Sequence, residues 1–339
     1  MSLSLTSTNH NIIVLVYLSR YGCLDYTKAI AKSIPSDLHL IISESNTETF
    51  SRYTLDALRV PDTKAALLLN TIVLRQKINR LLNRLLNEKN TFVLYFPAFH
   101  PLNELFLNWA IKNNIKSVIT IHDYVTHEGE KSTITETLQK RFIKKASQVN
   151  FLSHFVKNQA EKELGPNNNF KIRPHPILPS NVLNTKAHSA RPKLLFLGRV
   201  VDYKNVPVLI KSIKDLDIEK LTIAGQQMPK RDFNPNTDPR IEIIDKVLTD
   251  AEISHLLAEH HILVLPYLSA SQSGILTLGI ASEMVMVISK VGGLVEQLSP
   301  EGAIWVEPTE EGIRVGLELL MKSKSVYNKV KKAVIAFKS

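Results

Sequence analysis

A chain of 339 residues is too long for one ordinary hydrophobic core, and two domains of about 150 to 180 residues each are expected. Its 44% hydrophobic and 22% charged residues are ordinary for a soluble globular protein, and no apolar run is long enough for a transmembrane helix. The single cysteine, Cys23, excludes an internal disulfide and a cysteine-based zinc site. The net charge of +10 lies mainly in residues 1–178, with 22 Lys and Arg against 14 Asp and Glu, which indicates an anionic partner: a membrane surface, nucleic acid or an acidic substrate. No RNA- or DNA-binding signature favours nucleic acid.

The first half of the chain alternates strand and helix patterns. Residues 11–18 form a continuous apolar run that is typical of a buried parallel strand, and a polar turn and a helical pattern over 25–34 follow it. Further apolar runs, separated by helical stretches, cover residues 38–42, 91–96, 117–121 and 149–152. This alternation predicts a doubly wound parallel sheet.

The pattern is interrupted once and then starts again. Residues 178–192 contain several Pro, Ser and Asn residues and predict a linker. Strand patterns then cover 193–197, 221–224, 241–244, 262–265 and 285–289, with a helix over 206–214. We therefore predict two Rossmann-like α/β domains, over residues 1–180 and 181–320, that face a central cleft. A C-terminal helix over residues 321–339 is expected to pack back toward the N-terminal domain. Ligands of such sheets lie beyond the carboxyl ends of the strands.

Three loops of the second half carry the chemistry. In the first, residues 195–205 end a strand with Gly-Arg and place Arg199 and Lys204 around a turn, which suits a diphosphate clamp. Solvated basic residues in an ordinary turn are the alternative. In the second, residues 265–277 end a strand, turn at Ser-Gln-Ser-Gly and begin an apolar helix whose unpaired N–H groups can bind phosphate. Gly274 lets a ligand approach the backbone. The third loop, 289–296, is a glycine turn followed by Glu296.

In order and spacing, residues 193–298 resemble the donor-binding half of the GT-B glycosyltransferases, specifically the large retaining family 4, the glycosyl transferases group 1. That family carries Gly-Arg followed by Tyr-Lys-Gly, then Leu-Pro-Tyr and a phosphate loop, then Gly-Gly-x-x-Glu; the helix start at Thr249 also fits. The resemblance implies that Arg199 and Lys204 hold the donor diphosphate and that Glu296 lies near the nucleotide or sugar. It also implies donor contacts from the phosphate loop: Gln272, Ser273, Gly274, Ile275, Leu276 and Thr277.

The chain departs from the common family pattern at several positions. Many members carry two glutamates separated by seven residues around the phosphate loop, where this chain has Ser271 and Gly279. The loop resembles instead a branch that reads Ser- or Thr-Gln-Ser-Gly-Val, so the ribose contact is unassigned. Asn205 replaces the usual glycine after the lysine, and Val285 stands where proline is common.

On the acceptor side, His122 and Asp123 follow a buried strand, where a histidine that titrates near neutral pH can reach a cleft. A local packing role for His122 is the alternative. The same branch of the family often has His-Asp followed by another His here, so His122 and Asp123 are the catalytic candidates and His127 is secondary. Weaker candidates for the acceptor side or the cleft loops are Arg20, Tyr21, Gly22 and His175. His175 resembles the histidine of a Pro-His pair that precedes the hinge in the family; a purely structural role is the alternative.

A helix with two distinct faces is predicted over residues 74–86. Its apolar stripe comprises Leu74, Ile78, Leu81, Leu82 and Leu85, and its basic residues are Lys77, Arg80 and Arg84. The basic residues form either an ordinary solvated face or a docking surface for anionic lipid, which is a habit of family members that glycosylate lipid-linked acceptors.

The resemblance implies transfer of a sugar from a UDP- or GDP-sugar to a glycan or lipid-linked acceptor by front-face displacement, in cell-surface polysaccharide or glycolipid synthesis. No Asp-x-Asp motif or metal-ligand spacing is visible, so metal-independent chemistry without a cofactor is expected. The polar N-terminus lacks a signal-peptide pattern, so a cytoplasmic enzyme, peripheral on the membrane if the basic helix docks there, is expected. A nucleotide-sugar epimerase on the same fold and a non-catalytic scaffold are the alternatives; release of nucleotide only with acceptor would argue against the epimerase.

Overall fold

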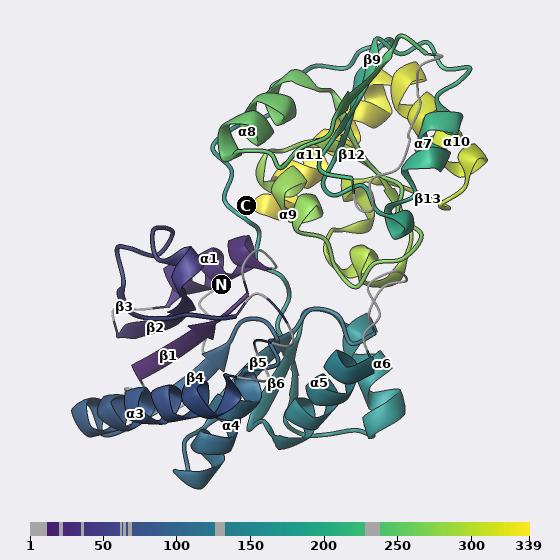
Figure 1. Cartoon of the computed structure of the whole chain (residues 1–339). Helices are drawn as coiled ribbons and strands as arrows, with labels where there is room; N and C mark the ends of the chain where they lie inside the picture. The colour runs from purple at the N-terminus through teal and green to yellow at the C-terminus, as the bar shows by residue number, and fades with distance from the viewer. Residues whose placement is uncertain are drawn as a thin grey trace. The chain divides into compact units, whose positions relative to one another are not determined.

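The computed structural model describes residues 12–19, 23–34, 37–61, 63, 66, 70–125, 133–227 and 238–339. The chain divides into two compact units (Figure 1). The first unit comprises Met1–Thr126, Ser132–Leu152 and Val156–Pro174, and the second comprises His127–Lys131, Ser153–Phe155 and His175–Ser339. The predicted site residues Arg20, Tyr21, Gly22 and His127 lie outside the described residues.

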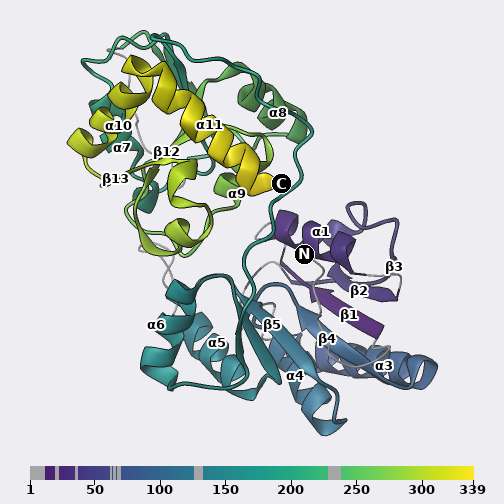
Figure 2. The same cartoon turned by 180° about the vertical axis from the view of Figure 1, so that it is seen from behind.

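The described part of the first unit holds a seven-stranded, wholly parallel sheet in the order β3-β2-β1-β4-β5-β6-β7. Its strands are β1 (Ile12–Tyr17), β2 (Leu38–Ser43), β3 (Thr54–Leu58), β4 (Phe92–Phe96), β5 (Ser117–Ile121), β6 (Gln148–Phe151) and β7 (Phe170–Ile172). Its helices are α1 (Leu24–Ser33), α3 (Thr71–Lys89), α4 (Asn103–Lys112), α5 (Thr133–Lys145) and α6 (His154–Leu164), of which the first two residues of α6 belong to the second unit. A 3₁₀ turn, η1 (Glu44–Asn46), follows β2. Because the strand order reverses between β1 and β4, α1 covers the face opposite to α3 and α4 (Figures 1 and 2).

The second unit repeats this plan with a six-stranded parallel sheet in the order β10-β9-β8-β11-β12-β13. Its strands are β8 (Lys193–Leu197), β9 (Lys220–Ala224), β10 (Ile241–Ile244), β11 (Ile262–Leu265), β12 (Val285–Ser289) and β13 (Ile304–Val306). Its helices are α7 (Val206–Ser212), α8 (Asp250–Glu259), α9 (Gly274–Ala281), α10 (Glu310–Lys322) and α11 (Lys324–Lys338), with 3₁₀ turns η2 (Asp202–Lys204), η3 (Gly292–Glu296) and η4 (Pro300–Gly302). The central strands are buried on both faces, as their continuous apolar runs predict.

The structure confirms the predicted fold class of two parallel-sheet α/β domains. The strands predicted over 117–121, 193–197, 241–244, 262–265 and 285–289 have these bounds in the structure. Strands β3, β7 and β13 are not predicted, because β7 and β13 have only three residues each and β3 is partly exposed and interrupted by Asp56. The predicted two-faced helix is α3, in which Leu74, Ile78, Leu82 and Leu85 are buried.

The C-terminal helix α11 packs inside the second unit. The Tyr327 hydroxyl donates to the carbonyls of Lys186 (3.2 Å) and His261 (3.3 Å), and the Lys331 ammonium donates to the carbonyls of Asn184 and Glu283. These bonds join the linker segment before β8 to the end of the chain. Across the described residues, no helix is both long and apolar enough to cross a membrane.

Candidate functional site

Lys204 is a buried lysine in the turn that follows β8. Its Nζ lies 4.9 Å from the centroid of the Tyr267 ring, an arrangement that stabilises a partly desolvated ammonium. Gly198 makes room for it, because a Cβ at this position would lie 2.8 Å from the Lys204 Nζ. The backbone N–H of Leu268 donates to the carbonyl of Tyr203 (2.7 Å) and thereby ties this turn to the end of β11.

Arg199 and Asn205 lie in the same turn as Lys204. Arg199 is exposed at the carboxyl end of β8, one residue after Gly198, which has a φ of +115°. Asn205 has φ 56° and ψ 32°, in the left-handed region that glycine favours and that asparagine tolerates better than most residues. This geometry explains why asparagine can replace the glycine that usually follows the lysine. The Asn205 side chain also donates to the carbonyl of Pro308 (3.1 Å).

The phosphate loop is held by Gln297, a residue outside the three motifs of the second half. The Gln297 Oε1 accepts from the backbone N–H of Ser273 (2.7 Å), and its Nε2 donates to the Ser273 carbonyl (3.3 Å). The two bonds fix both backbone groups of the residue that precedes α9. A motif search misses this role, since Gln297 lies one position beyond the Gly-Gly-x-x-Glu pattern.

Helix α9 begins at this loop with two open backbone donors. The Ser273 hydroxyl caps the helix by accepting from the N–H of Leu276 (3.2 Å), and the N–H of Thr277 donates to the Ser273 carbonyl (3.3 Å). Among the described residues, the N–H groups of Gly274 and Ile275 find no acceptor. Of the main-chain groups predicted to bind phosphate, these two N–H groups therefore remain available to a ligand. They lie at the positive end of the helix dipole.

Two further side chains of the loop are polar and enclosed. Burial raises the pKa of Tyr267 to about 12, against a smaller lowering by the side chain of Ser273, so the phenol stays protonated at neutral pH. The Oε1 of Gln272 is buried and has no hydrogen-bond partner among the described residues. A buried amide oxygen without a partner is costly, and a ligand donor at this position would relieve that cost.

The glycine turn after β12 packs directly on the phosphate loop. A Cβ on Gly292 would lie 2.0 Å from the Ala270 carbonyl oxygen, and one on Gly293 would lie 2.0 Å from that of Ser271. The N–H of Gly293 donates to the Ala270 carbonyl (2.9 Å). Only residues without a side chain permit this approach, so the Gly-Gly pair is a structural requirement of the loop.

The Glu296 carboxylate accepts hydrogen bonds from two backbone N–H groups of the second unit. These are the N–H groups of His154 (2.6 Å to Oε2) and Phe155 (2.8 Å to Oε1), the first residues of α6. The neighbouring Ser153 hydroxyl donates to the Ser271 carbonyl (3.2 Å). Glu296 therefore fixes the turn over Ser153–Phe155 beside the phosphate loop, and its contact with nucleotide or sugar stays a prediction.

Ser271 and Gly279, at the two positions where many family members carry a glutamate, have different surroundings in this structure. A Cβ on Gly279 would lie 2.8 Å from Leu263 Cδ2 and 2.9 Å from Met286 Sδ, so this position of α9 packs tightly on the sheet. Ser271 is buried. A second glutamate at position 279 would require the sheet face to repack, which agrees with its absence from this sequence.

In the first unit, His122 lies at the carboxyl end of β5 and is almost fully buried. Its Nε2 is 2.9 Å from the Pro97 carbonyl oxygen, and its ring packs edge-on against Tyr26 at 4.6 Å between centroids. Burial lowers the pKa of His122, but the side chain of Cys23, the Pro97 carbonyl and the Asp123 carboxylate outweigh it and raise the pKa to about 9. His122 is therefore a cation at neutral pH. Asp123 is half-buried, and its carbonyl accepts from the Gln139 amide (2.8 Å).

Beneath His122 lies a cluster of three buried hydroxyls that the sequence does not reveal. The Tyr95 hydroxyl is 2.7 Å from Thr120 Oγ1, and the Tyr26 hydroxyl is 3.2 Å from Tyr95 and 3.3 Å from Thr120. Burial raises the pKa of both tyrosines. The residues come from α1, β4 and β5, so no local sequence pattern links them. The cluster fixes the ring of Tyr26, which in turn supports His122.

The remaining predicted residues lie apart from these groups. His175 is half-buried in the second unit, with its Nδ1 2.8 Å from the Pro176 carbonyl oxygen. On α3, Arg84 is bound by Asp56 (2.6 Å), which also pairs with the buried His39 (2.8 Å), whereas Lys77 and Arg80 are exposed. The described residues include no group of three or more His, Cys, Asp or Glu side chains that could hold a metal ion.

Residues 191–320 match the sequence model of the family described as glycosyl transferases group 1. The match covers the Arg199–Lys204 turn, the loop before α9 and the Gly-Gly turn. A search of curated protein sequences finds no match.

Several solved structures share the fold of the whole chain. HepE of Anabaena in complex with UDP and glucose superposes with a TM-score of 0.74 at 12% identity, over 96% of this chain and 94% of that one. Sucrose-phosphate synthase of Thermosynechococcus elongatus has a TM-score of 0.71 at 13% identity, over 97% and 95%. A putative UDP-N-acetylglucosamine 2-epimerase of Listeria monocytogenes has a TM-score of 0.59 at 8% identity, over 96% and 91%. At these identities the likeness shows the GT-B fold; together with the family match it supports a glycosyltransferase, as the sequence predicts.

Proposed function

We propose that the chain is a retaining glycosyltransferase of family 4 that moves a sugar from a nucleotide-diphosphate-sugar to a glycan or lipid-linked acceptor. The observation that carries the proposal is the donor loop of the second unit. There, a buried lysine, an exposed arginine and two helix-start N–H groups that have no acceptor among the described residues lie beyond the carboxyl ends of β8 and β11.

These groups match the needs of a leaving nucleoside diphosphate. Departure of the diphosphate builds negative charge on its oxygens, and preorganised donors that face this charge stabilise the transition state. Lys204 and Arg199 supply full charges, while Gly274 and Ile275 supply backbone N–H groups at the start of α9. Gln297 and the Gly-Gly turn hold the loop in place before the donor binds.

The acceptor side is assigned to the first unit. In a front-face displacement the donor phosphate oxygen takes the proton of the acceptor hydroxyl, and the new glycosidic bond forms on the face that the diphosphate leaves. His122, held as a cation with its Nε2 at the Pro97 carbonyl, would then act on the acceptor side through its positive charge rather than as a base. Asp123 would accept a hydrogen bond from a neighbouring hydroxyl.

UDP is the nucleotide that we propose for the donor. HepE, which shares the fold over nearly the whole chain, was solved with UDP and glucose and with UDP-glucose. The Arabidopsis starch synthase IV, also similar in fold, was solved with ADP and acarbose, so the adenine series is the main competitor. We further propose a role in cell-surface polysaccharide or glycolipid synthesis at the cytoplasmic membrane face, supported by the basic first unit.

A nucleotide-sugar epimerase is the second candidate, because two 2-epimerase structures share the fold with TM-scores of 0.59 and 0.55. The sequence match over residues 191–320 favours the transferase.

The test is incubation of the purified chain with UDP-glucose, UDP-galactose, UDP-N-acetylglucosamine and their ADP and GDP counterparts, with and without a glycan acceptor mixture, followed by proton NMR of the anomeric signals. The proposal predicts nucleotide release that depends on acceptor and an α-linked product from an α-linked donor. A β-linked product would contradict retention, and a 2-epimer formed without acceptor would establish the epimerase.

A further inference from the structure

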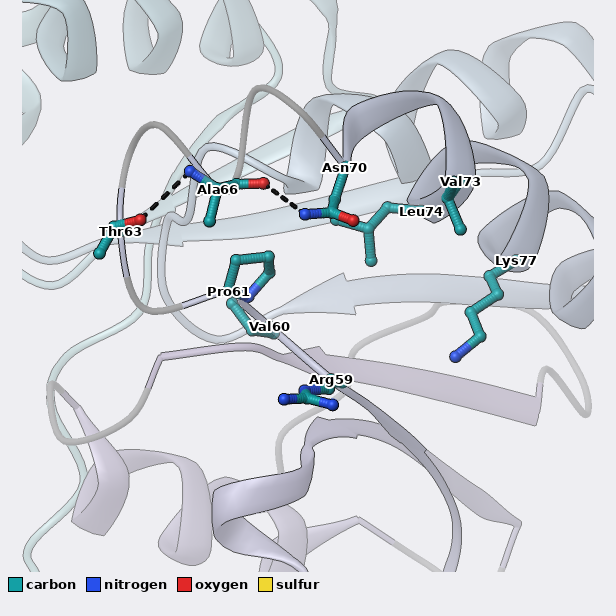
Figure 3. Close-up of a pocket in the computed structure, with 9 residues that line it drawn as sticks. All are labelled: Arg59, Val60, Pro61, Thr63, Ala66, Asn70, Val73, Leu74 and Lys77. Atoms are coloured by element: carbon teal, nitrogen blue, oxygen red, sulfur yellow. Dashed lines mark hydrogen bonds between the residues drawn. The ribbon is translucent and has the colours of Figure 1, made fainter.

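Two adjoining cavities open in the first unit at the edge where ligands of a doubly wound sheet bind. The first, of about 590 Å³, lies at the carboxyl ends of β1, β2, β3 and β4 and is lined by Leu18, Ser19, Ser43, Glu44, Ser45, Arg59, Val60, Pro61 and His100. The second, of about 550 Å³, lies between the end of β3 and the start of α3 (Figure 3). Arg59, Val60 and Pro61 line both cavities and join them.

The first cavity is polar in the manner of a saccharide site. Burial lowers the pKa of His100 to about 4, so its ring is neutral at physiological pH. The ring's Nδ1 accepts from the N–H of Leu102 (3.2 Å), which places the proton on Nε2 as a donor. Glu44 supplies acceptor oxygens, and the hydroxyls of Ser43 and Ser45, 3.1 Å apart, can donate or accept. Vicinal sugar hydroxyls, which donate and accept at once, match this mixture.

The described residues that line the second cavity supply positive charge and no carboxylate. Arg59 and Lys77 are exposed residues on its wall, and Figure 3 shows Lys77 extending from α3 toward the side on which Arg59 lies. None of the described residues that line this cavity is acidic, and neither cation forms a salt bridge with another described residue. Asn70 and Thr63 are partly engaged, through the Asn70 amide to the Ala66 carbonyl (2.8 Å) and the Ala66 N–H to the Thr63 hydroxyl (3.1 Å).

We propose that these cavities bind an acidic saccharide as the acceptor. Its ring lies in the polar cavity, and its carboxylate or phosphate group is bound by Arg59 and Lys77; this assignment rests on the proposed transferase function. Arg59 is the main determinant, because its guanidinium borders both cavities and can pair with a carboxylate or phosphate through two parallel hydrogen bonds. Lys77 adds a point charge to the same group.

The experiment is an NMR titration of the full chain with glucuronate, glucose 6-phosphate and neutral glucose, alongside UDP binding by calorimetry on the same samples. We expect the acidic sugars to bind at least about tenfold more tightly than glucose. Arg59→Gln should remove this preference and Lys77→Gln should reduce it about threefold. Arg75→Gln, an equal charge change at an exposed residue of α3 outside the cavity lining, should leave it intact. Thermal melting verifies that each variant is folded, and UDP binding should be unchanged in all three.

Equal binding of glucose and glucuronate, or a preference that persists in Arg59→Gln, would overturn the inference. So would displacement of glucuronate by inorganic phosphate at equal concentration, since the site would then recognise a bare anion. Displacement by phosphatidylglycerol vesicles but not by phosphatidylcholine vesicles would assign the cations to lipid headgroups and overturn it as well. A chain that binds glucuronate but no nucleotide would refute the proposed function and leave this site standing.

Discussion

At the scale of single residues, the donor loop depends on the Gln297 side chain, which bonds both backbone groups of Ser273. We expect Gln297→Leu to lose about 1 to 3 kcal/mol of stability, the net value of two hydrogen bonds and the cost of an unpaired N–H. UDP affinity should fall about tenfold or more, because Gly274 and Ile275 are then no longer preorganised. Calorimetric titration and urea unfolding measure the two effects. Gln297→Glu, which keeps an acceptor for the Ser273 N–H, should retain more stability; equal UDP affinity in wild type and both variants would refute the loop assignment.

The raised pKa of His122 predicts that the free energy of unfolding depends on pH. This pKa, about 9 in the folded chain, lies above the ordinary value of 6.5, so the proton is bound more tightly after folding. This contribution is complete below pH 6.5 and is lost as the pH rises through 9. The free energy of unfolding should therefore fall over this range more steeply in wild type than in His122→Asn. Parallel pH profiles from urea unfolding of the two proteins would contradict the assignment.

The residue roles that the sequence predicts are those with a fixed chemical type at a fixed spacing. Arg199, Lys204 and the Gly-Gly pair belong to this group, since charge and the absence of a side chain can be read from a letter. The role of Gln297, the hydroxyl cluster of Tyr26, Tyr95 and Thr120, and the burial of His122 arise from packing between distant segments, which no single loop contains.

At the scale of elements, the two helix caps of the second unit offer a matched comparison. Ser273 caps α9 at the phosphate loop, and Thr249 caps α8 with a full capping box that the sequence pattern Thr-Asp-x-Glu anticipates. Ser273→Ala and Thr249→Ala should each cost about 1 kcal/mol of stability. Only Ser273→Ala should weaken UDP binding, by about threefold to tenfold, because only α9 begins at the loop that we propose to bind the donor. A similar loss of UDP affinity in both variants would point to general destabilisation.

Elements with a strong local signal are predicted well. The buried central strands have continuous apolar runs, so their bounds follow from the sequence. Edge strands such as β3 and β13 are stabilised mainly by pairing with a neighbouring strand, a contact that the local pattern does not contain. Helix α3 extends beyond the predicted range because its first turn, with exposed Ile72 and Val73, does not follow the apolar stripe.

At the scale of the whole molecule, the charge of +10 and the exposed Arg80 of α3, which lies outside the cavity lining, predict binding to anionic membranes. Arg84 is held by Asp56, so Arg80, exposed beyond Lys77, is the better lipid contact. We expect co-sedimentation with phosphatidylglycerol vesicles that weakens with salt and is reduced several-fold in Arg80→Gln but less in Arg84→Gln. Binding that is insensitive to salt, or an equal effect of both variants, would argue against this surface.

The architecture of the whole chain follows from its alternating pattern, and the structure and the comparisons confirm it. What the pattern does not specify is the donor sugar, the nucleobase and the acceptor. For the acceptor we propose the cavity of Arg59 and His100, whose lining residues come from separate loops of the sheet.

The donor site that we propose requires the loops after β8 and β11 to bind a nucleoside diphosphate, and one titration measures this binding. UDP and UDP-glucose are titrated by calorimetry into wild type, Arg199→Ala/Lys204→Ala and a control, Lys211→Ala/Lys214→Ala, whose lysines are exposed at and just after the end of α7. We predict that the Arg199/Lys204 variant binds at least about tenfold more weakly, a loss of about 1.4 kcal/mol or more, and that the control binds like wild type. A folded wild-type chain that binds no nucleotide, or equal affinity in all three proteins, would contradict the account.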